Sequence, residues 1–188
     1  MVRTISTLII LFIGTLMGQS LPGIIPNWAD SGVMSINLAD TSGVKQILGS
    51  PMDNLIEPDD EFPYVCYSNM ERTEYWKLIF HPGSVGNSFN EFEVGKYASE
   101  LSCITLRRDG SIKSNKGIKL GMTMKEVIAV LGQNYKTSNG GSELQYTYNV
   151  LEEGSSVFMS HYNMQLYLGI YRFREGHLEW FKFGFEYP

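Results

Sequence analysis

The sequence predicts an α+β fold built of two tandem units, in each of which a short helix precedes an antiparallel sheet and covers one of its faces. Three observations support this prediction. Two helical patterns of about two turns each end at a glycine, alternating strand-like runs follow each helix, and the patterns of the first half recur in the second half. Helices this short are not stable alone, so each must pack against a sheet.

The chain of 188 residues begins with a pattern typical of an export signal. Arg3 precedes an uncharged run over residues 5–17, and the small residues Gly18 and Ser20 suit a cleavage site. We therefore expect a signal peptide over residues 1–20 and a secreted or periplasmic protein; a retained N-terminal anchor is the alternative. The run is shorter than the roughly 20 residues of a membrane span, and no lipid-attachment cysteine follows it directly. We expect no stable membrane anchor after cleavage.

An N-terminal extension and a first helix follow. Residues 21–35 are rich in Pro, Gly and Ser and predict little regular structure, with Trp28 as the expected packing anchor. The first unit, residues 36–113, then opens with a helical pattern. Asp40 is its expected N-cap, apolar residues recur at helical spacing, and Gly49 ends it.

The second unit, residues 114–188, contains the most clearly specified helix. Thr123 and Glu126 have the spacing of a capping box, in which each side chain accepts the backbone N–H of the other residue. Gly132 can adopt the left-handed conformation that ends a helix. The apolar residues between them share one face: Val127, Val130 and Leu131.

The two halves match when the helical patterns are aligned at a separation of 83 positions. Apolar and glycine positions then coincide, with Val44, Ile47, Leu48 and Gly49 meeting Val127, Val130, Leu131 and Gly132. Residues 89–95 and 178–184 match at a separation of 89 positions. Two diverged copies of one unit explain both matches. Coincidence between ordinary amphipathic elements is the alternative.

The clearest hairpin lies over residues 164–187, where two alternating strands flank a two-residue Glu-Gly turn. This turn pairs Phe173 with Leu178 and Tyr171 with Trp180, which sorts the side chains onto two faces. The predicted core face contains Leu166, Leu168, Ile170, Phe181, Phe183 and Phe185. The opposite face contains Tyr167, Tyr171, Phe173, Leu178, Trp180 and Lys182. Residues 144–148 and 157–161 predict two further strands.

The first unit shows the same pattern, with strands at residues 75–80 and 89–95. If the units correspond, Phe92 and Val94 face the core beside Ile79. The other side of this sheet then carries Trp76, Leu78, Phe80, Phe89, Glu91 and Glu93.

The helix region of the second unit resembles a known family. Residues 114–132 resemble the strand-to-helix passage of the SmpA/OmlA (BamE-like) envelope protein family, and are similar to the tandem fold of the secreted beta-lactamase inhibitor protein. The residues that carry the resemblance are Gly121, Met122, Thr123, Glu126, Val127, Leu131, Gly132 and Tyr146. The resemblance implies a helix-plus-antiparallel-sheet unit but no particular partner, because these residues cap and pack. The chain departs from the family in lacking the lipid-attachment cysteine, and in having Gln133-Asn134 in place of the common proline.

Composition excludes some functions. The formal net charge is −5 and no basic run occurs, so we expect no nucleic-acid partner. The acidic residues 57–61 lack the ligand spacing of a calcium loop and predict a solvated loop. Cys66 and Cys103 lie in strand-like runs, which permits a disulfide in an oxidising compartment; two buried free thiols are the alternative.

No catalytic or metal pattern is found in the sequence. His81, His161 and His177 lack the spacing of a helical zinc site, and Ser84 lacks the context of a nucleophile elbow. We expect neither an enzyme nor a metal or other cofactor. A small-ligand carrier, or a hydrolase with His161 or His177 as its base, is the alternative function.

The aromatic face of the sheet is the candidate functional site. Contiguous aromatic patches are unusual on monomers, and Tyr and Trp suit interfaces because they bury much area at small entropic cost. We therefore expect a protein partner at Trp76, Phe80, Glu91, Tyr167, Tyr171, Phe173, Trp180 and Lys182. The alternative is that the extension over residues 21–35 covers this face and makes it a second core.

Overall fold

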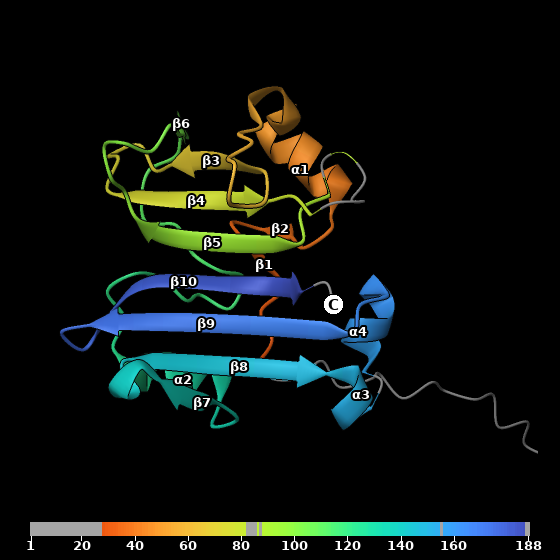
Figure 1. Ribbon diagram of the computed structural model, residues 1–188. Helices are drawn as coiled ribbons and strands as arrows, with labels where there is room; N and C mark the ends of the chain where they lie inside the picture. The colour runs from red at the N-terminus through yellow and green to blue at the C-terminus, as the bar shows by residue number, and fades with distance from the viewer. Residues whose placement is uncertain (1–27, 82–85, 87, 155, 187–188) are drawn as a thin grey trace, which may run out of the picture.

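The computed structural model describes residues 28–81, 86, 88–154 and 156–186. The signal peptide predicted over residues 1–20 lies outside the described residues. The fold is α+β, as predicted, and its largest element is an eight-stranded sheet with the order β6-β3-β4-β5-β10-β9-β8-β7 (Figure 1). No helix in the described part of the chain has the length and apolar character that a membrane span requires.

The described chain is a succession of short helices and strands. In order they are β1 (Gly32–Val33), β2 (Ile36–Asn37), α1 (Thr41–Leu48), the 3-10 helix η1 (Pro51–Asn54), β3 (Tyr64–Ser68), β4 (Glu74–Ile79), β5 (Glu91–Lys96), β6 (Ile104–Thr105), α2 (Met124–Leu131), β7 (Lys136–Ser138), the 3-10 turn η2 (Asn139–Gly141), β8 (Glu143–Asn149), α3 (Val150–Glu153), α4 (Val157–Tyr162), β9 (Leu166–Arg174) and β10 (His177–Glu186).

Two antiparallel meanders form most of the sheet. Strands β3, β4 and β5 make one and β8, β9 and β10 the other, and they join because β10 pairs antiparallel with β5, from Trp180 opposite Gly95 to Gly184 opposite Glu91. A Cβ at Gly184 would collide with the carbonyl oxygen of Asn90, so this close approach of the two strands requires glycine. The sheet is therefore continuous across both halves of the chain (Figure 1).

Helix α2 has the predicted capping box. The Thr123 hydroxyl accepts the N–H of Glu126 at 3.3 Å, and the Glu126 carboxylate accepts the N–H of Thr123 at 2.7 Å. Gly132 ends the helix with φ 88°, and its carbonyl accepts a hydrogen bond from the Tyr146 hydroxyl at 2.9 Å. This bond ties the end of α2 to β8, and Val127 on the buried side of the helix is fully buried.

Helix α1 begins and ends as predicted but buries less of its apolar face. Asp40 caps it by accepting the N–H of Gly43 at 2.8 Å, and Gly49 follows the last turn with φ 77°. Val44 is buried, whereas Ile47 is 45% exposed. The apolar face of α1 is therefore only partly covered.

The segment predicted to form a further strand over residues 157–161 is helix α4, so that prediction was wrong. Ser156 caps the helix by accepting the N–H of Met159 at 3.1 Å. Phe158 and Tyr162 lie one helical turn apart and their ring centroids are 5.2 Å from each other. The run of apolar residues suited either structure, and the serine cap together with this spacing favours the helix.

A β-bulge in β10 changes the predicted register. Phe173 pairs with Leu178 as expected, but Trp180 then pairs with Arg172 and Phe181 with Tyr171, leaving Glu179 unpaired. Because of the extra residue, Leu178 and Phe181 lie on the same face. Every pair after the bulge is shifted by one position from the predicted register. The predicted faces of β10 are therefore correct from Trp180 onward, and those of β9 are inverted.

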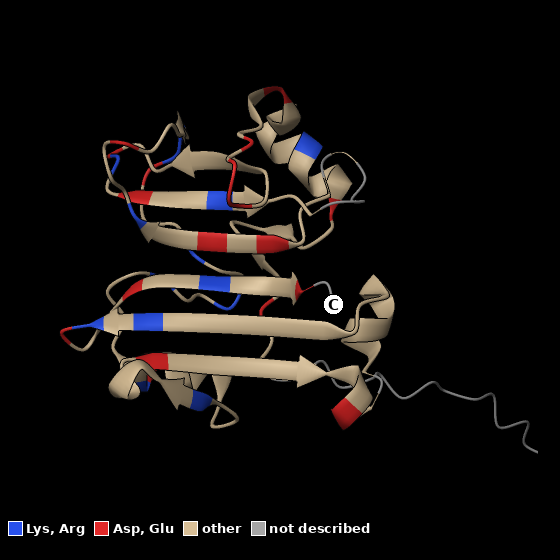
Figure 2. Ribbon diagram, in the orientation of Figure 1, with Lys and Arg blue, Asp and Glu red and all other residues tan. Residues whose placement is uncertain are grey.

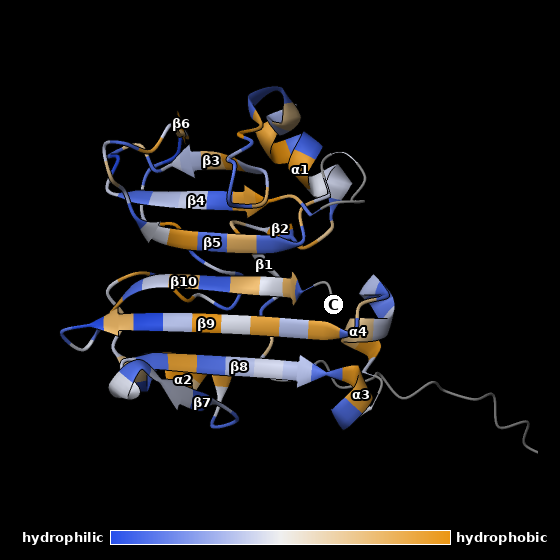
Figure 3. Cartoon of the chain, in the orientation of Figure 1, coloured by the Kyte–Doolittle hydropathy of each residue, from blue (hydrophilic) through white to orange (hydrophobic). Residues whose placement is uncertain are grey.

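One face of the sheet, which we call the closed face, forms the core. Along the second meander it carries Leu144, Tyr146, Tyr167, Tyr171, Phe173, Leu178, Phe181, Phe183 and Phe185, and along the first Val65, Tyr67, Trp76, Leu78, Phe92 and Val94. Buried residues of α1, α2 and α4 belong to the same cluster. Strands β5 and β10 accordingly alternate between hydrophobic and hydrophilic residues (Figure 3).

The described end of the N-terminal extension covers part of the closed face. Trp28 packs as predicted, with its ring centroid 5.7 Å from that of Tyr167. The Tyr167 hydroxyl accepts the backbone N–H of Asp30 and donates to its carbonyl, both at 2.9 Å. The strands β1 and β2 then form a small sheet, which lies behind the large one in Figure 1. The described part of the predicted extension, residues 28–35, contains only the two-residue strand β1, which agrees with the prediction of little regular structure.

Candidate partner-binding face of the sheet

Most of the aromatic residues predicted to bind a partner lie in the core. Trp76 and Tyr167 are at most 1% exposed, as is Tyr171, and Phe173 is 5% exposed. Phe80 is half-buried against the same core. The prediction that these side chains form an accessible face was wrong, because the bulge inverts β9 and because Trp76 lies opposite Val94 on the closed face. The alternative, in which the extension helps to bury the aromatic residues, describes Tyr167 correctly.

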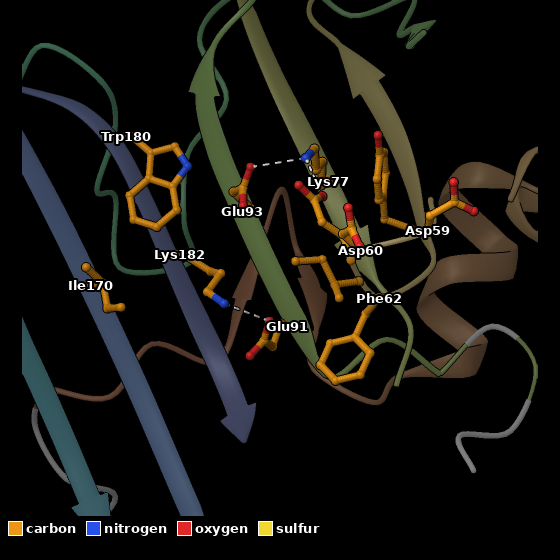
Figure 4. A pocket seen from close by; sticks show the side chains of 12 residues that line it. Asp59, Asp60, Phe62, Lys77, Glu91, Glu93, Ile170, Trp180 and Lys182 are labelled. Atoms are coloured by element: carbon orange, nitrogen blue, oxygen red, sulfur yellow. Dashed lines mark hydrogen bonds and ion pairs between the residues drawn. The ribbon is translucent and has the colours of Figure 1, made fainter. Parts of the chain in front are cut away.

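The remaining predicted residues, Glu91, Trp180 and Lys182, do lie together on the opposite face, which we call the open face. There they line a groove of about 660 Å³ between β10 and the loop that precedes β3 (Figure 4). The groove is lined by Asp59, Asp60, Glu61, Phe62, Tyr64, Lys77, Ile79, Glu91, Glu93, Ile170, Trp180 and Lys182. Acidic, basic and aromatic side chains from both meanders therefore meet in one depression.

Glu91 forms the centre of one charged group on the floor of the groove. Its carboxylate lies 3.2 Å from the Lys182 ammonium and 3.7 Å from Nε2 of the buried His81. Burial raises the pKa of Glu91, but the hydrogen bond from His81 and the charge of Lys182 outweigh it and hold the pKa below its usual value. Glu91 is therefore ionised at neutral pH and holds Lys182 across the junction of β5 and β10.

A second charged group joins β4 to β5. The Lys77 ammonium lies 3.6 Å from Glu93 and 3.5 Å from Glu61, and 4.3 Å from the centre of the Tyr64 ring. The Tyr75 hydroxyl donates to Glu93 at 2.6 Å. Burial, and then the charge of Glu93, raise the pKa of Tyr75 far above its usual value, so this hydroxyl keeps its proton and remains a donor.

Trp180 is fixed from both sides of the sheet junction. The Tyr75 side chain lies over Gly95, the residue of β5 that pairs with Trp180. The Arg172 guanidinium lies 4.7 Å from the centre of the indole ring and pairs with Glu143 at 3.2 Å. A cation over an aromatic ring is favourable, and here the Glu143 carboxylate orients that cation. Trp180 therefore lines the groove in a defined orientation and is only half-buried.

The groove carries an excess of negative charge. Five carboxylates and two ammonium groups line it, which leaves three unbalanced negative charges. Asp59 and Asp60 are exposed and make no ion pair with any described residue. The inner carboxylates pair with lysines of neighbouring strands. In Figure 2 the red segments of β5 lie between the blue segments of β4 and β10. The unbalanced charge is thus concentrated toward the rim.

The histidines proposed as bases in the alternative function lie elsewhere. His161 is exposed on α4, where its ring centroid is 4.8 Å from that of Tyr162. His177 is exposed beside the β9–β10 turn. Neither lines the groove. Ser84 lies outside the described residues, and no cluster of metal-ligating side chains occurs among the residues that are described.

The two cysteines take the bridging alternative. Cys66 of β3 is joined to Cys103, which directly precedes β6. The bond holds the edge strand β6 beside β3, where Leu106 also donates its N–H to the carbonyl of Ser68 at 2.8 Å. The edge of the sheet is therefore fixed covalently as well as by pairing.

Sequence reasoning did not include Lys77, Tyr75 and Ile170 in the site. A signal for Lys77 was present, because Lys77, Glu93 and Lys182 occupy alternate strand positions between core residues, and charged side chains at such positions face away from the core. Charge alternation was therefore a better indicator of the open face than aromatic content. Comparisons of the chain with protein-family models, curated proteins and solved structures found no match.

Proposed function

We propose that this chain is an exported, non-catalytic binding protein that engages a protein partner through the open face of its sheet. The observation that carries the proposal is the half-buried Trp180, which lies beside Tyr75 and under the Arg172 guanidinium at the wall of a groove large enough for several side chains. A fixed aromatic ring surrounded by charged residues is typical of the energetically dominant part of an interface. The excess negative charge favours a partner that presents basic side chains.

We also propose that the chain arose as a tandem repeat and is related to the SmpA/OmlA (BamE-like) family. Two features of the fold support the tandem repeat. Each meander follows a capped helix that ends at a glycine. Positions aligned at the separation of 89 residues also fall on the same faces: Phe92 and Phe181 on the closed face, and Glu91 and Trp180 on the open face. In such a repeat, the helices of both units would occupy the same side of the sheet.

Export is supported by the Cys66–Cys103 disulfide, because structural disulfides persist in oxidising compartments such as the periplasm or the exterior of the cell. This agrees with the signal peptide expected over residues 1–20. A secreted or periplasmic location would place the groove where envelope or extracellular proteins can reach it.

The proposal is tested by affinity capture from the envelope and medium of the source organism, with three forms of the protein as bait. Trp180→Ala removes the fixed ring, whereas Leu151→Ala is a matched control because Leu151 is 81% exposed on α3 and does not line the groove. We expect one protein to be captured by the natural chain and by the control, and to be lost with Trp180→Ala. Identical capture by all three forms would refute a role for the open face. Thermal unfolding of each bait shows whether a loss reflects misfolding.

A further inference from the structure

A smaller cavity, separate from the groove, lies between α1 and the residues that follow β6. Its volume is about 390 Å³, within the range of small-molecule sites. It is lined by Met34, Ile47, Leu48, Trp76, Leu106, Arg107 and Arg108. None of these residues lines the groove, so the cavity can be occupied independently of a partner on the open face.

The walls of this cavity are largely apolar. Met34, Leu48 and Leu106 are half-buried against the core, and Ile47 is 45% exposed. Helix α1 therefore presents to the cavity the part of its apolar face that the core leaves uncovered. The surface is concave and partly open, so binding a hydrocarbon group there displaces water from apolar side chains. This displacement is favourable.

The polar groups of the cavity are hydrogen-bond donors. Trp76 is fully buried, so its indole N–H is not accessible from the cavity and the arginines are the donors that a ligand can reach. Arg107 and Arg108 are exposed, and neither forms an ion pair or hydrogen bond with the residues described. The nearest carboxylate in sequence, Asp109, lines the neighbouring polar depression and not this cavity. A ligand would have to supply the acceptor.

We propose that this cavity binds a small amphipathic anion, a carboxylate that carries a short hydrocarbon chain. The hydrocarbon would lie against the α1 side, and the carboxylate would take hydrogen bonds from the arginines, whose planar guanidinium groups match its geometry. The ring of Trp76 forms part of the same wall.

The wall that carries the arginines is held in place before any ligand binds. Leu106 is fixed by its hydrogen bond to Ser68, and the preceding residues are held by the pairing of β6 with β3 and by the Cys66–Cys103 disulfide. A site with a fixed wall loses little conformational entropy when it binds a ligand.

Calorimetric titration of the purified protein with octanoate tests the proposal, with octanol and octylamine as ligands of the same chain length. We expect octanoate to bind, and the neutral and cationic ligands to bind at least about tenfold more weakly, because hydrogen bonds to charged groups contribute that much. The double variant Arg107→Gln/Arg108→Gln should weaken octanoate binding by about tenfold and leave octanol unchanged.

The controls separate this site from the groove and from misfolding. Arg174→Gln removes another exposed arginine, on β9, and should bind octanoate normally, and so should Trp180→Ala. Both arginines of the cavity are exposed, so their replacement tests the site without disturbing the core. Absence of octanoate binding, equal binding of octanoate and octanol, or undiminished binding by the double variant would each overturn the proposal.

Discussion

The two faces of the sheet are stabilised in different ways. On the closed face, aromatic rings stack within the core, with Tyr171 and Phe181 centred 5.9 Å apart and Phe181 and Phe183 6.3 Å apart. On the open face, the strands are joined by ion pairs, such as Glu91 with Lys182. Burial of apolar area stabilises the first face strongly, whereas ion pairs contribute less net free energy and fix position instead. Aromatic content alone therefore does not mark a binding surface in this protein.

The largest expected effect comes from removing a ring of the closed face. Tyr171 is 1% exposed, so Tyr171→Ala should lower the free energy of unfolding by about 4 kcal/mol, because it leaves a cavity in the core. Trp180→Ala should lower it by only about 1 kcal/mol, since that ring is half-buried. Urea unfolding of the two variants measures both values. Equal losses would mean that the two faces do not differ in the way described.

A smaller effect is expected at the centre of the open face. Glu91→Gln removes the charge that Lys182 and His81 contact, and should cost about 2 kcal/mol at neutral pH. The pKa of Glu91 is lower in the folded protein than its unfolded value of about 4.3. The stabilisation is therefore complete above that unfolded value and is lost as the pH falls through the lower, folded pKa.

Unfolding measured between neutral and acidic pH checks this expectation. The natural chain should lose part of its stability as the pH falls below about 4.3, and Glu91→Gln should lose less over the same interval. Glu100→Gln serves as the control because Glu100 is exposed, so its pH dependence should match that of the natural chain. An unchanged acid transition in Glu91→Gln would show that this carboxylate does not stabilise the open face.

Features that depend on neighbouring residues could be predicted from the sequence, and features that depend on distant pairing could not. The capping box at Thr123 and Glu126 is local, and the alternation of Phe181 with Phe183 fixed the faces of β10. The bulge at Glu179 could not be predicted in this way, because one extra residue changes neither the composition of the strand nor the alternation on each side of it. A single shift of register was enough to place Tyr167 on the wrong face.

The site was predicted in part for the same reason. Glu91, Trp180 and Lys182 lie on strands whose faces were assigned correctly, and the structure brings them to one groove. The burial of Tyr167 depends on Asp30, more than 130 positions away in the chain, and no local pattern indicates that contact. The charges at Lys77 and Glu93 would have identified the open face independently of any register.

The smallest expected effect tests the bulge itself. Deleting Glu179 would make β10 regular, with Leu178 and Trp180 adjacent and on opposite faces. Each would keep its present partner on β9. The deletion removes the partly exposed ion pair with Arg174, whose atoms lie 3.5 Å apart, and pairs of this kind contribute about 1 kcal/mol or less. We expect a loss of that size in urea unfolding, and cross-strand NMR contacts that still pair Tyr171 with Phe181. A loss of unfolding free energy as large as that of Tyr171→Ala would mean that the bulge is needed to pack the closed face. The register of β9 and β10 alone would then not explain which residues are buried.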